Sequence, residues 1–82
     1  MPSVFGPVYL ADLRALPRRA RQRAAAMVRE HEANPEPDGI FKRPAPPPFK
    51  AGTIVAVASG LVIRYAMDSD GLRFYRVQRL DP

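Results

Sequence analysis

The residues of this chain that can act on an anion are arginines, lysines and tyrosines. The sequence has one histidine and no cysteine. It shows no Gly-rich phosphate-binding loop, no His, Asp and Glu cluster at metal-ligand spacing, and no Ser-His-Asp set. His31 falls on the apolar stripe of a predicted helix, where a structural role is the more common one. Catalysis would therefore use Arg, Lys, Tyr and carboxylate side chains, and we expect neither a metal ion nor a small-molecule cofactor.

Three β-rich runs fill residues 52–80 and are predicted to form an antiparallel meander. The runs are rich in Val, Ile, Tyr, Phe and Thr, and the turn signals Ser59-Gly60 and Asp68-Ser69-Asp70-Gly71 divide them. Register decides which side chains share a face, because a slip of one residue exchanges the two faces. Pairing across the second turn predicts the opposing residues Met67 and Leu72, Tyr65 and Phe74, Ile63 and Arg76, and Leu61 and Gln78.

In this register the two faces of the second hairpin differ in character. One face is apolar, suits packing on a helix, and has Arg76 as its one misfit; it presents Leu61, Ile63, Tyr65, Met67, Leu72 and Phe74. The other face gathers three guanidinium groups and a phenol; it presents Val62, Arg64, Ala66, Arg73, Tyr75, Val77 and Arg79. This basic face is a candidate anion-binding surface. An ordinary solvated sheet face is the equally weighted alternative.

An amphipathic helix over residues 17 to about 33 is predicted to cover the apolar face. Pro17 suits a first helical position, and Asn34-Pro35 ends the segment. The apolar stripe consists of Ala20, Ala24, Met27, Val28 and His31. Arginines crowd the start of the helix at Arg14, Arg18, Arg19, Arg21 and Arg23. The helix dipole disfavours cations there, which indicates either an anionic partner or a plain solvated basic face.

The other segments are predicted to be short connections. A strand at residues 8–10 would extend the sheet, and Asp12 would cap a turn of helix reaching Leu16. Residues 35–50 form a Pro-rich crossover loop, with a Pro-rich peptide ligand as the less favoured alternative. Three apolar side chains are predicted to fix this loop to the core: Ile40, Phe41 and Phe49. The cations of this loop are Lys42, Arg43 and Lys50.

Size and charge limit the class of protein. The 82 residues form one small domain, residues 1–82, with a net charge of +5 and a pI near 10.5, so its partners are expected to be anionic: nucleic acid or an acidic protein. No apolar run approaches the roughly 18 residues of a membrane span, no signal peptide is recognised, and we expect a cytoplasmic protein. The predicted fold class is α+β, with a small antiparallel sheet of three C-terminal strands and a candidate fourth N-terminal strand, packed on the helix.

Together these segments resemble the RelE/ParE toxin superfamily of type II toxin–antitoxin systems, over roughly residues 10–80. The matching pieces are Leu16-Pro17-Arg18-Arg19-Ala20, Asn34-Pro35-Glu36-Pro37-Asp38-Gly39, Ile63-Arg64-Tyr65, Asp68-Ser69-Asp70-Gly71-Leu72 and the final strand at 74–79. The resemblance implies a RelE-like domain bound by the acidic segment of an antitoxin. Some members cleave mRNA on the ribosome without a metal ion, and others inhibit DNA gyrase. Val62 stands where the nuclease branch often has arginine, and Arg64 is the nearest substitute.

The resemblance also implies roles for the basic residues. RNA cleavage needs a base for the 2′-OH proton, cations for the phosphorane, and an acid for the leaving 5′-oxygen. The predicted catalytic residues are Arg64, Arg79, Tyr75 and Lys50, and the predicted RNA contacts are Arg73, Lys42, Arg43, Arg18, Arg19 and Arg21. Two alternatives remain: a nucleic-acid- or ribosome-binding module without chemistry, and a ParE-like toxin that inhibits a protein target.

Overall fold

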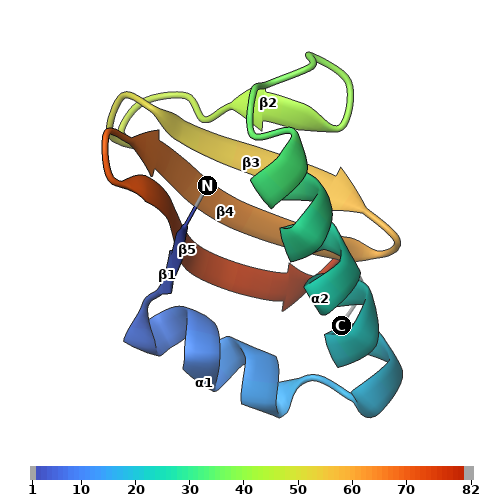
Figure 1. Cartoon of the computed structure of the whole chain (residues 1–82). Coiled ribbons are helices and arrows are strands. Elements are labelled where there is room, and N and C mark those ends of the chain that lie inside the picture. Colours follow the sequence, from blue (N-terminus) through green and yellow to red (C-terminus); the bar gives the residue numbers. More distant parts are fainter. Residues whose placement is uncertain (1, 81–82) are drawn as a thin grey trace.

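Two helices and a five-stranded sheet make up the computed structural model, which describes residues 2–80. The elements follow the chain in the order β1 (Ser3–Phe5), α1 (Pro7–Ala15), α2 (Arg18–Ala33), β2 (Lys42–Pro44), β3 (Thr53–Ala58), β4 (Leu61–Asp68) and β5 (Gly71–Arg79). In Figure 1, α2 crosses one face of the sheet and α1 runs along β5. Neither helix is long and apolar enough to cross a bilayer within the described residues.

The sheet is mixed, with strand order β1-β5-β4-β3-β2. The three predicted C-terminal strands are present, and they form antiparallel neighbours as expected. The predicted sheet is extended on both sides, because β1 pairs parallel with β5 and β2 pairs antiparallel with β3. The expectation of a purely antiparallel sheet is therefore wrong at its N-terminal edge.

The first fifteen residues differ from the sequence prediction. The predicted strand at residues 8–10 lies inside α1, which has Pro7 in its first turn and Gly6 as its N-cap. Proline fixes φ at a helical value and lacks an N–H that the first turn cannot use, so α1 begins there. The edge strand precedes it as β1. Asp12 is an internal residue of α1, so its predicted capping role is also wrong.

A strand inside the Pro-rich crossover was not predicted. One oxygen of the Asp38 carboxylate accepts hydrogen bonds from the backbone N–H groups of Ile40, Phe41 and Lys42, at 2.8, 2.9 and 2.9 Å. This turn sends the next residues back along β3, where they pair from Lys42 to Pro44. Proline is tolerated there because β2 is an edge strand.

The amphipathic helix is confirmed as α2. All five residues of its predicted stripe are buried, and its C-cap is Asn34, as the Asn-Pro signal indicated. Pro17 is the N-cap rather than the first helical residue. The stripe and the apolar sheet face form one core, in which the largest fully buried side chains are Tyr9, Tyr65, Phe74, Leu61, Ile63, Leu72 and Val77.

A β-bulge at Tyr75 changes the predicted register of the second hairpin. Near the turn the predicted pairs hold, with Met67 opposite Leu72 and Tyr65 opposite Phe74. Tyr75 then has no partner, and the following pairs are Arg64 and Arg76, Ile63 and Val77, and Leu61 and Arg79. The predicted pairs of Ile63 with Arg76 and Leu61 with Gln78 are therefore wrong. The bulge moves Val77 into the core and Arg76 off the apolar face.

Beyond β1, helix α1 covers the edge of β5. The carboxylate of Asp12 accepts hydrogen bonds from Arg76 Nε at 2.7 Å and Nη2 at 3.3 Å, and from the backbone N–H of Val77 at 3.2 Å. A little earlier, the N–H of Gly6 donates to the carbonyl of Phe74 at 3.0 Å. These bonds satisfy backbone groups that an edge strand would otherwise leave open to another chain.

The junction of β1 with β5 predicts a large effect for one glycine. Gly71 has φ +135°, and a Cβ atom there would collide with the carbonyl of Pro2. That carbonyl accepts the N–H of Leu72 at 2.9 Å, so it cannot move without loss of the β1 pairing. We expect Gly71→Ala to lower the free energy of unfolding by several kcal/mol, on the order of a lost buried contact plus backbone strain.

Urea unfolding followed by far-UV circular dichroism measures this change, with Gly60→Ala as the matched control. Gly60 also has a positive φ, +74°, but an added Cβ would meet no atom within 4 Å. Gly60→Ala should therefore cost only about 1–2 kcal/mol. Equal losses in the two variants would contradict the proposed collision with Pro2.

Candidate functional site

The face of the sheet turned away from the helices carries several of the predicted site residues. Ile54 is buried in the core, so its neighbour Val55 points to the other side. Arg43 and Arg64 pair with Val55 from the two flanking strands and share that side. We name this helix-free side the open face; its central residues are Arg43, Val55, Arg64, Ala66, Arg73 and Tyr75.

A hollow of about 330 Å³ on the open face brings three predicted site residues together. Lys50 reaches it from the Pro-rich loop, Arg73 from β5, and Tyr75 from the bulge. The backbone carbonyl of Lys50 accepts a hydrogen bond from the N–H of Thr53 at 3.1 Å, which forms a turn just before β3. The hollow therefore joins an amine, a guanidinium and a phenol, which are the groups that sequence analysis selected for acting on a phosphate.

Asp68 also lines this hollow, and sequence analysis did not assign it to the site. Its Oδ2 accepts a hydrogen bond from Arg73 Nε at 2.9 Å, and its Oδ1 accepts the N–H of Asp70 at 2.8 Å. The Arg73 hydrogen bond holds the pKa of the Asp68 carboxyl below its usual value. The ionised carboxylate offsets part of the positive charge that Arg73 would otherwise present to an anion. The sequence feature that could have indicated this role is the position of Asp68 at the start of the acidic turn, five residues before Arg73.

Arg64 lies against an aromatic side chain of the crossover loop. Its guanidinium carbon is 4.8 Å from the centroid of the Phe49 ring, a cation–π contact. Phe49 is 43% exposed and borders the open face, and Ile40 and Phe41 are 68% and 61% exposed. The prediction that these three side chains fix the loop to the core is therefore wrong. Phe49 was missed as a site residue, because nothing in the local pattern of the loop indicates which side of the sheet it covers.

Arg79 lies apart from the other predicted catalytic residues. It pairs with Leu61, whose side chain is buried on the helix-facing side. Because paired residues share a face, Arg79 belongs to the side opposite Arg64 and Arg73. The prediction that these three arginines share one face is wrong, and the bulge at Tyr75 is the physical reason.

Lys42 is not available to a nucleic acid. It pairs with the buried Ala56, so it points toward α2 while Arg43 points outward. Its ammonium group donates to both carboxylate oxygens of Glu30, at 3.0 and 3.3 Å, and to the carbonyl of Asn34. Lys42 is 6% exposed, so its predicted RNA contact is corrected to a structural contact between β2 and α2.

The arginines at the start of α2 lie on the helix side of the molecule. Arg18, Arg19 and Arg21 are exposed, and Arg21 Nη1 also donates to the carbonyl of Leu16 at 3.2 Å. They are separated from the open face by the sheet. Among residues 2–80, no group of three or more His, Asp or Glu side chains is placed to hold a metal ion.

His31 occupies a buried position beside Lys42. Its ring stacks on Tyr65 at a centroid distance of 4.8 Å, and its Nδ1 lies 2.8 Å from Glu30 Oε2. Burial lowers the pKa of His31 below its ordinary value, against the opposing hydrogen bond with Glu30 and with a smaller contribution from Lys42 in the same direction. The folded protein therefore holds the neutral imidazole.

This lowered pKa predicts a loss of stability on acidification. Between pH 7.5 and 5.5 the unfolded chain takes up a proton at its one histidine, while the folded chain resists it. The free energy of unfolding should fall as pH drops through about 6.5, by at most about 1.4 kcal/mol per pH unit. Urea midpoints at several pH values measure the slope, and His31→Phe, which keeps an aromatic ring on Tyr65, should show a smaller one. The same slope in both proteins would contradict this assignment.

Two solved structures share the fold of this chain, although sequence comparison finds no relative. The chain matches no protein-family model and no curated protein sequence at a significant level. It is similar to a chain in the crystal structure of the toxin–antitoxin complex RelBE2 from Mycobacterium tuberculosis, with a TM-score of 0.80, 20% identity, and 94% of both chains covered. It is also similar to a chain of the RelB–RelE antitoxin–toxin complex from Methanococcus jannaschii, with a TM-score of 0.66 and 16% identity over 93% of this chain and 88% of that chain. At these identities the likeness shows a shared fold.

Proposed function

We propose that this chain is the toxin of a type II toxin–antitoxin system and acts as a metal-independent mRNA endoribonuclease at the ribosome. The observation that carries the proposal is the hollow on the open face, where Lys50, Arg73 and Tyr75 meet. The fold supports it, since both similar structures are complexes of an antitoxin with a toxin. The net charge of +5 supports RNA and an acidic antitoxin segment as the partners. The proposed place of action is the cytoplasm, where ribosomes translate mRNA.

The reaction is an in-line transfer within the RNA. The 2′-oxygen forms a bond to phosphorus, the bond to the 5′-oxygen breaks, and the products end in a 2′,3′-cyclic phosphate and a 5′-hydroxyl. Lys50 and Tyr75 line the hollow. One of them takes the proton of the 2′-OH and the other gives a proton to the leaving 5′-oxygen. Arg64 and Arg73 stabilise the charge that develops on the phosphorane oxygens. Arg43, farther along the open face, binds the RNA backbone.

A second function uses the same fold without chemistry. The Arg73–Asp68 ion pair and the displacement of Arg79 both reduce the cationic charge at the hollow. Less cationic charge means weaker stabilisation of the phosphorane, which favours a function without catalysis. Such a function is a nucleic-acid-binding module, or a ParE-like toxin that inhibits a protein through α2 and β5. The second function predicts RNA or protein binding with no cleavage, so one assay distinguishes the two functions.

We expect the wild-type protein to slow growth when it is expressed alone and to cut mRNA on translating ribosomes. Lys50→Ala should reduce cleavage about 100-fold or more, the usual effect of removing a proton-transfer group. The matched control is Arg79→Ala, an exposed arginine of β5 on the opposite side of the sheet, which should change cleavage less than about twofold. Sequencing of cleaved ends should find cyclic phosphates and 5′-hydroxyls.

Intact mRNA with the wild-type protein would exclude the nuclease function. Ribosome or RNA binding in that case would assign the open face to the non-catalytic module, and growth arrest without RNA binding would favour the protein-inhibiting toxin. A larger loss from Arg79→Ala than from Lys50→Ala would show that the hollow is the wrong site. Far-UV circular dichroism of each variant separates these results from unfolding.

A further inference from the structure

Four aromatic side chains of residues 2–80 are more than a third exposed: Phe5, Phe41, Phe49 and Tyr75. An exposed aromatic ring is informative in a protein with a cationic face, because unpaired bases of RNA stack on such rings. What lies against each face of a ring decides whether the ring can hold a base.

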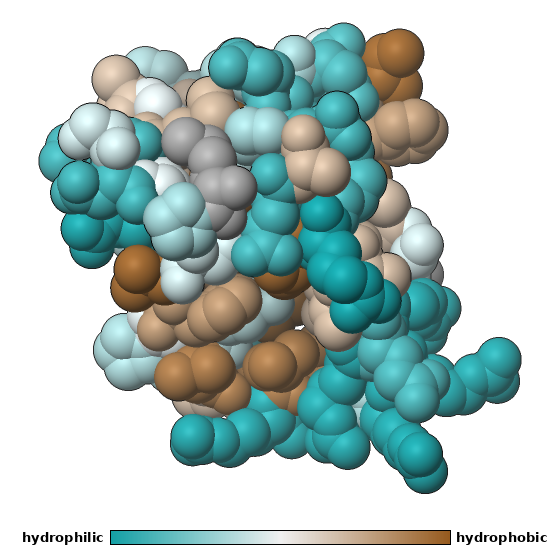
Figure 2. Space-filling view, viewed as in Figure 1, coloured by the Kyte–Doolittle hydropathy of each residue, from teal (hydrophilic) through white to brown (hydrophobic). Residues whose placement is uncertain are grey.

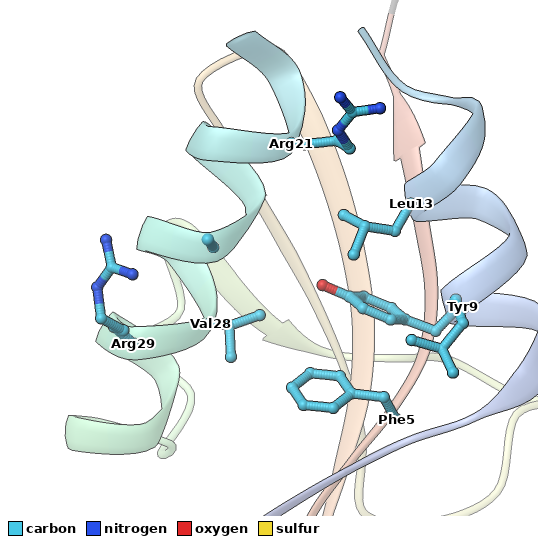
Figure 3. A pocket seen from close by; sticks show the side chains of 8 residues that line it. Phe5, Tyr9, Leu13, Arg21, Val28 and Arg29 are labelled. Carbon is cyan, nitrogen blue, oxygen red and sulfur yellow. The ribbon is translucent and has the colours of Figure 1, made fainter. Parts of the chain in front are cut away.

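Phe5 belongs to the side of the sheet that the helices cover. Its ring centroid lies 5.3 Å from that of Tyr9 and 5.3 Å from that of Phe74. Figure 3 shows Phe5 beside Tyr9 in the space between α1 and α2. Figure 2 views this side from outside, where hydrophobic side chains gather over α1 and hydrophilic ones follow α2. Phe5 is therefore part of the packing of α1 on the sheet, away from the open face.

Phe49 lies at the open face, and a cation covers one side of its ring. The guanidinium carbon of Arg64 is 4.8 Å from the ring centroid. A ring has two faces, so the exposed 43% of Phe49 includes the opposite one. Within residues 2–80 the side chain of Arg64 pairs with no carboxylate, so its charge stays available to an anion. Phe41, although 61% exposed, lies over no cation in the same part of the chain.

The backbone on both sides of Phe49 is fixed. Its N–H donates to the carbonyl of Pro46 at 3.1 Å, and the carbonyl of Lys50 accepts the N–H of Thr53 at 3.1 Å. The three prolines that precede Phe49 have restricted φ angles. The ring is therefore held in place before a ligand arrives, so less conformational freedom is lost on binding.

The ring of Phe49 is a neighbour of the hollow on the open face. Lys50, the next residue, lines the hollow, and Tyr75 lines it from the bulge that lies opposite Arg64 and Tyr65. A ligand on Phe49 therefore meets a flat ring, a guanidinium behind that ring, and a cationic hollow beside it. A nucleotide has the matching parts, because it joins a flat base to an anionic phosphate.

We propose that Phe49 is a stacking platform for one unpaired base of the RNA, next to the phosphate that binds in the hollow. Arg64 holds the ring from behind and attracts the phosphate of the stacked nucleotide. The proposal rests on the proposed function in taking RNA as the ligand. It adds that the RNA must be single-stranded at this nucleotide, because a paired base is stacked within its own duplex. Every base has a flat face, so Phe49 selects unpaired nucleotides rather than one kind of base.

A single strand that cannot be cleaved tests the platform. The probe is a fluorescein-labelled heptamer of 2′-O-methyl RNA, in which the methyl group removes the attacking hydroxyl. Fluorescence anisotropy should show that Phe49→Leu weakens binding about tenfold, whereas Phe49→Tyr keeps the ring and retains most of the affinity. The matched control is Phe41→Leu, the same change at an exposed phenylalanine, which should change binding less than twofold. Binding of the strand annealed to its complement should not depend on Phe49→Leu.

Abasic nucleotides separate stacking from a purely structural role of Phe49. Removal of one base at a time should weaken wild-type binding most at one position of the strand. At that position Phe49→Leu should cause less than a twofold further loss, because the stacking contact is already absent. If Phe49 only fixed the loop that carries Lys50, the loss from Phe49→Leu would be the same in every strand. Thermal melting checks that the variants keep their fold.

Three results would overturn the proposal. These are no binding of the single strand by the wild type, a loss from Phe49→Leu no larger than that from Phe41→Leu, and a loss from Phe49→Leu that persists in the duplex or at every abasic position. The expected coupling with mRNA left intact on ribosomes would refute the nuclease alone. Cleavage of mRNA together with any of the three results would refute the stacking platform alone.

Discussion

Two side chains of β5 must both enter the core although their spacing does not suit a regular strand. Phe74 and Val77 are three residues apart and both are almost fully buried, whereas alternation would turn one of them outward. The bulge at Tyr75 resolves this conflict by adding one unpaired residue. It also releases Arg76 to the sheet edge, where the carboxylate of Asp12 holds α1 against β5. Core packing, edge protection and the composition of the open face all depend on this single insertion.

Prediction from sequence succeeded where the pattern was long and failed where pairing decided the outcome. The stripe of α2 spans three turns and the C-terminal strands carry six to nine residues each, so local periodicity was enough. Strands β1 and β2 have three residues each, too few for any period. β1 exists because of its hydrogen bonds to β5, and β2 because the Asp38 turn returns the chain to β3. Those interactions join residues that are distant in sequence, and one sequence alone does not reveal them.

The candidate site shows the same division. Arg64, Arg73 and Tyr75 were placed on one face correctly, because Arg73 and Tyr75 lie on the turn side of the bulge or within it and β4, which carries Arg64, has no inserted residue. Lys50 meets two of them in the hollow. Arg79 lies beyond the bulge, so its predicted side was inverted. Lys42 was misplaced because a three-residue strand gives no signal of which residue points inward, and its partner Glu30 became apparent only in the folded chain. An error of one residue in register is therefore enough to change the membership of a site.

Strand β1 forms the boundary between the open face and the side of the sheet that the helices cover. Phe5 pairs with Phe74 and stacks on its ring on the helix-covered side, whereas the neighbouring Val4 pairs with Arg73 on the open face and is 56% exposed. Adjacent strands lie only about 4.8 Å apart, so a single edge strand separates the aromatic side of the core from the cationic hollow. The fold thus places the apolar core of the molecule within one strand of the cationic side chains on the open face.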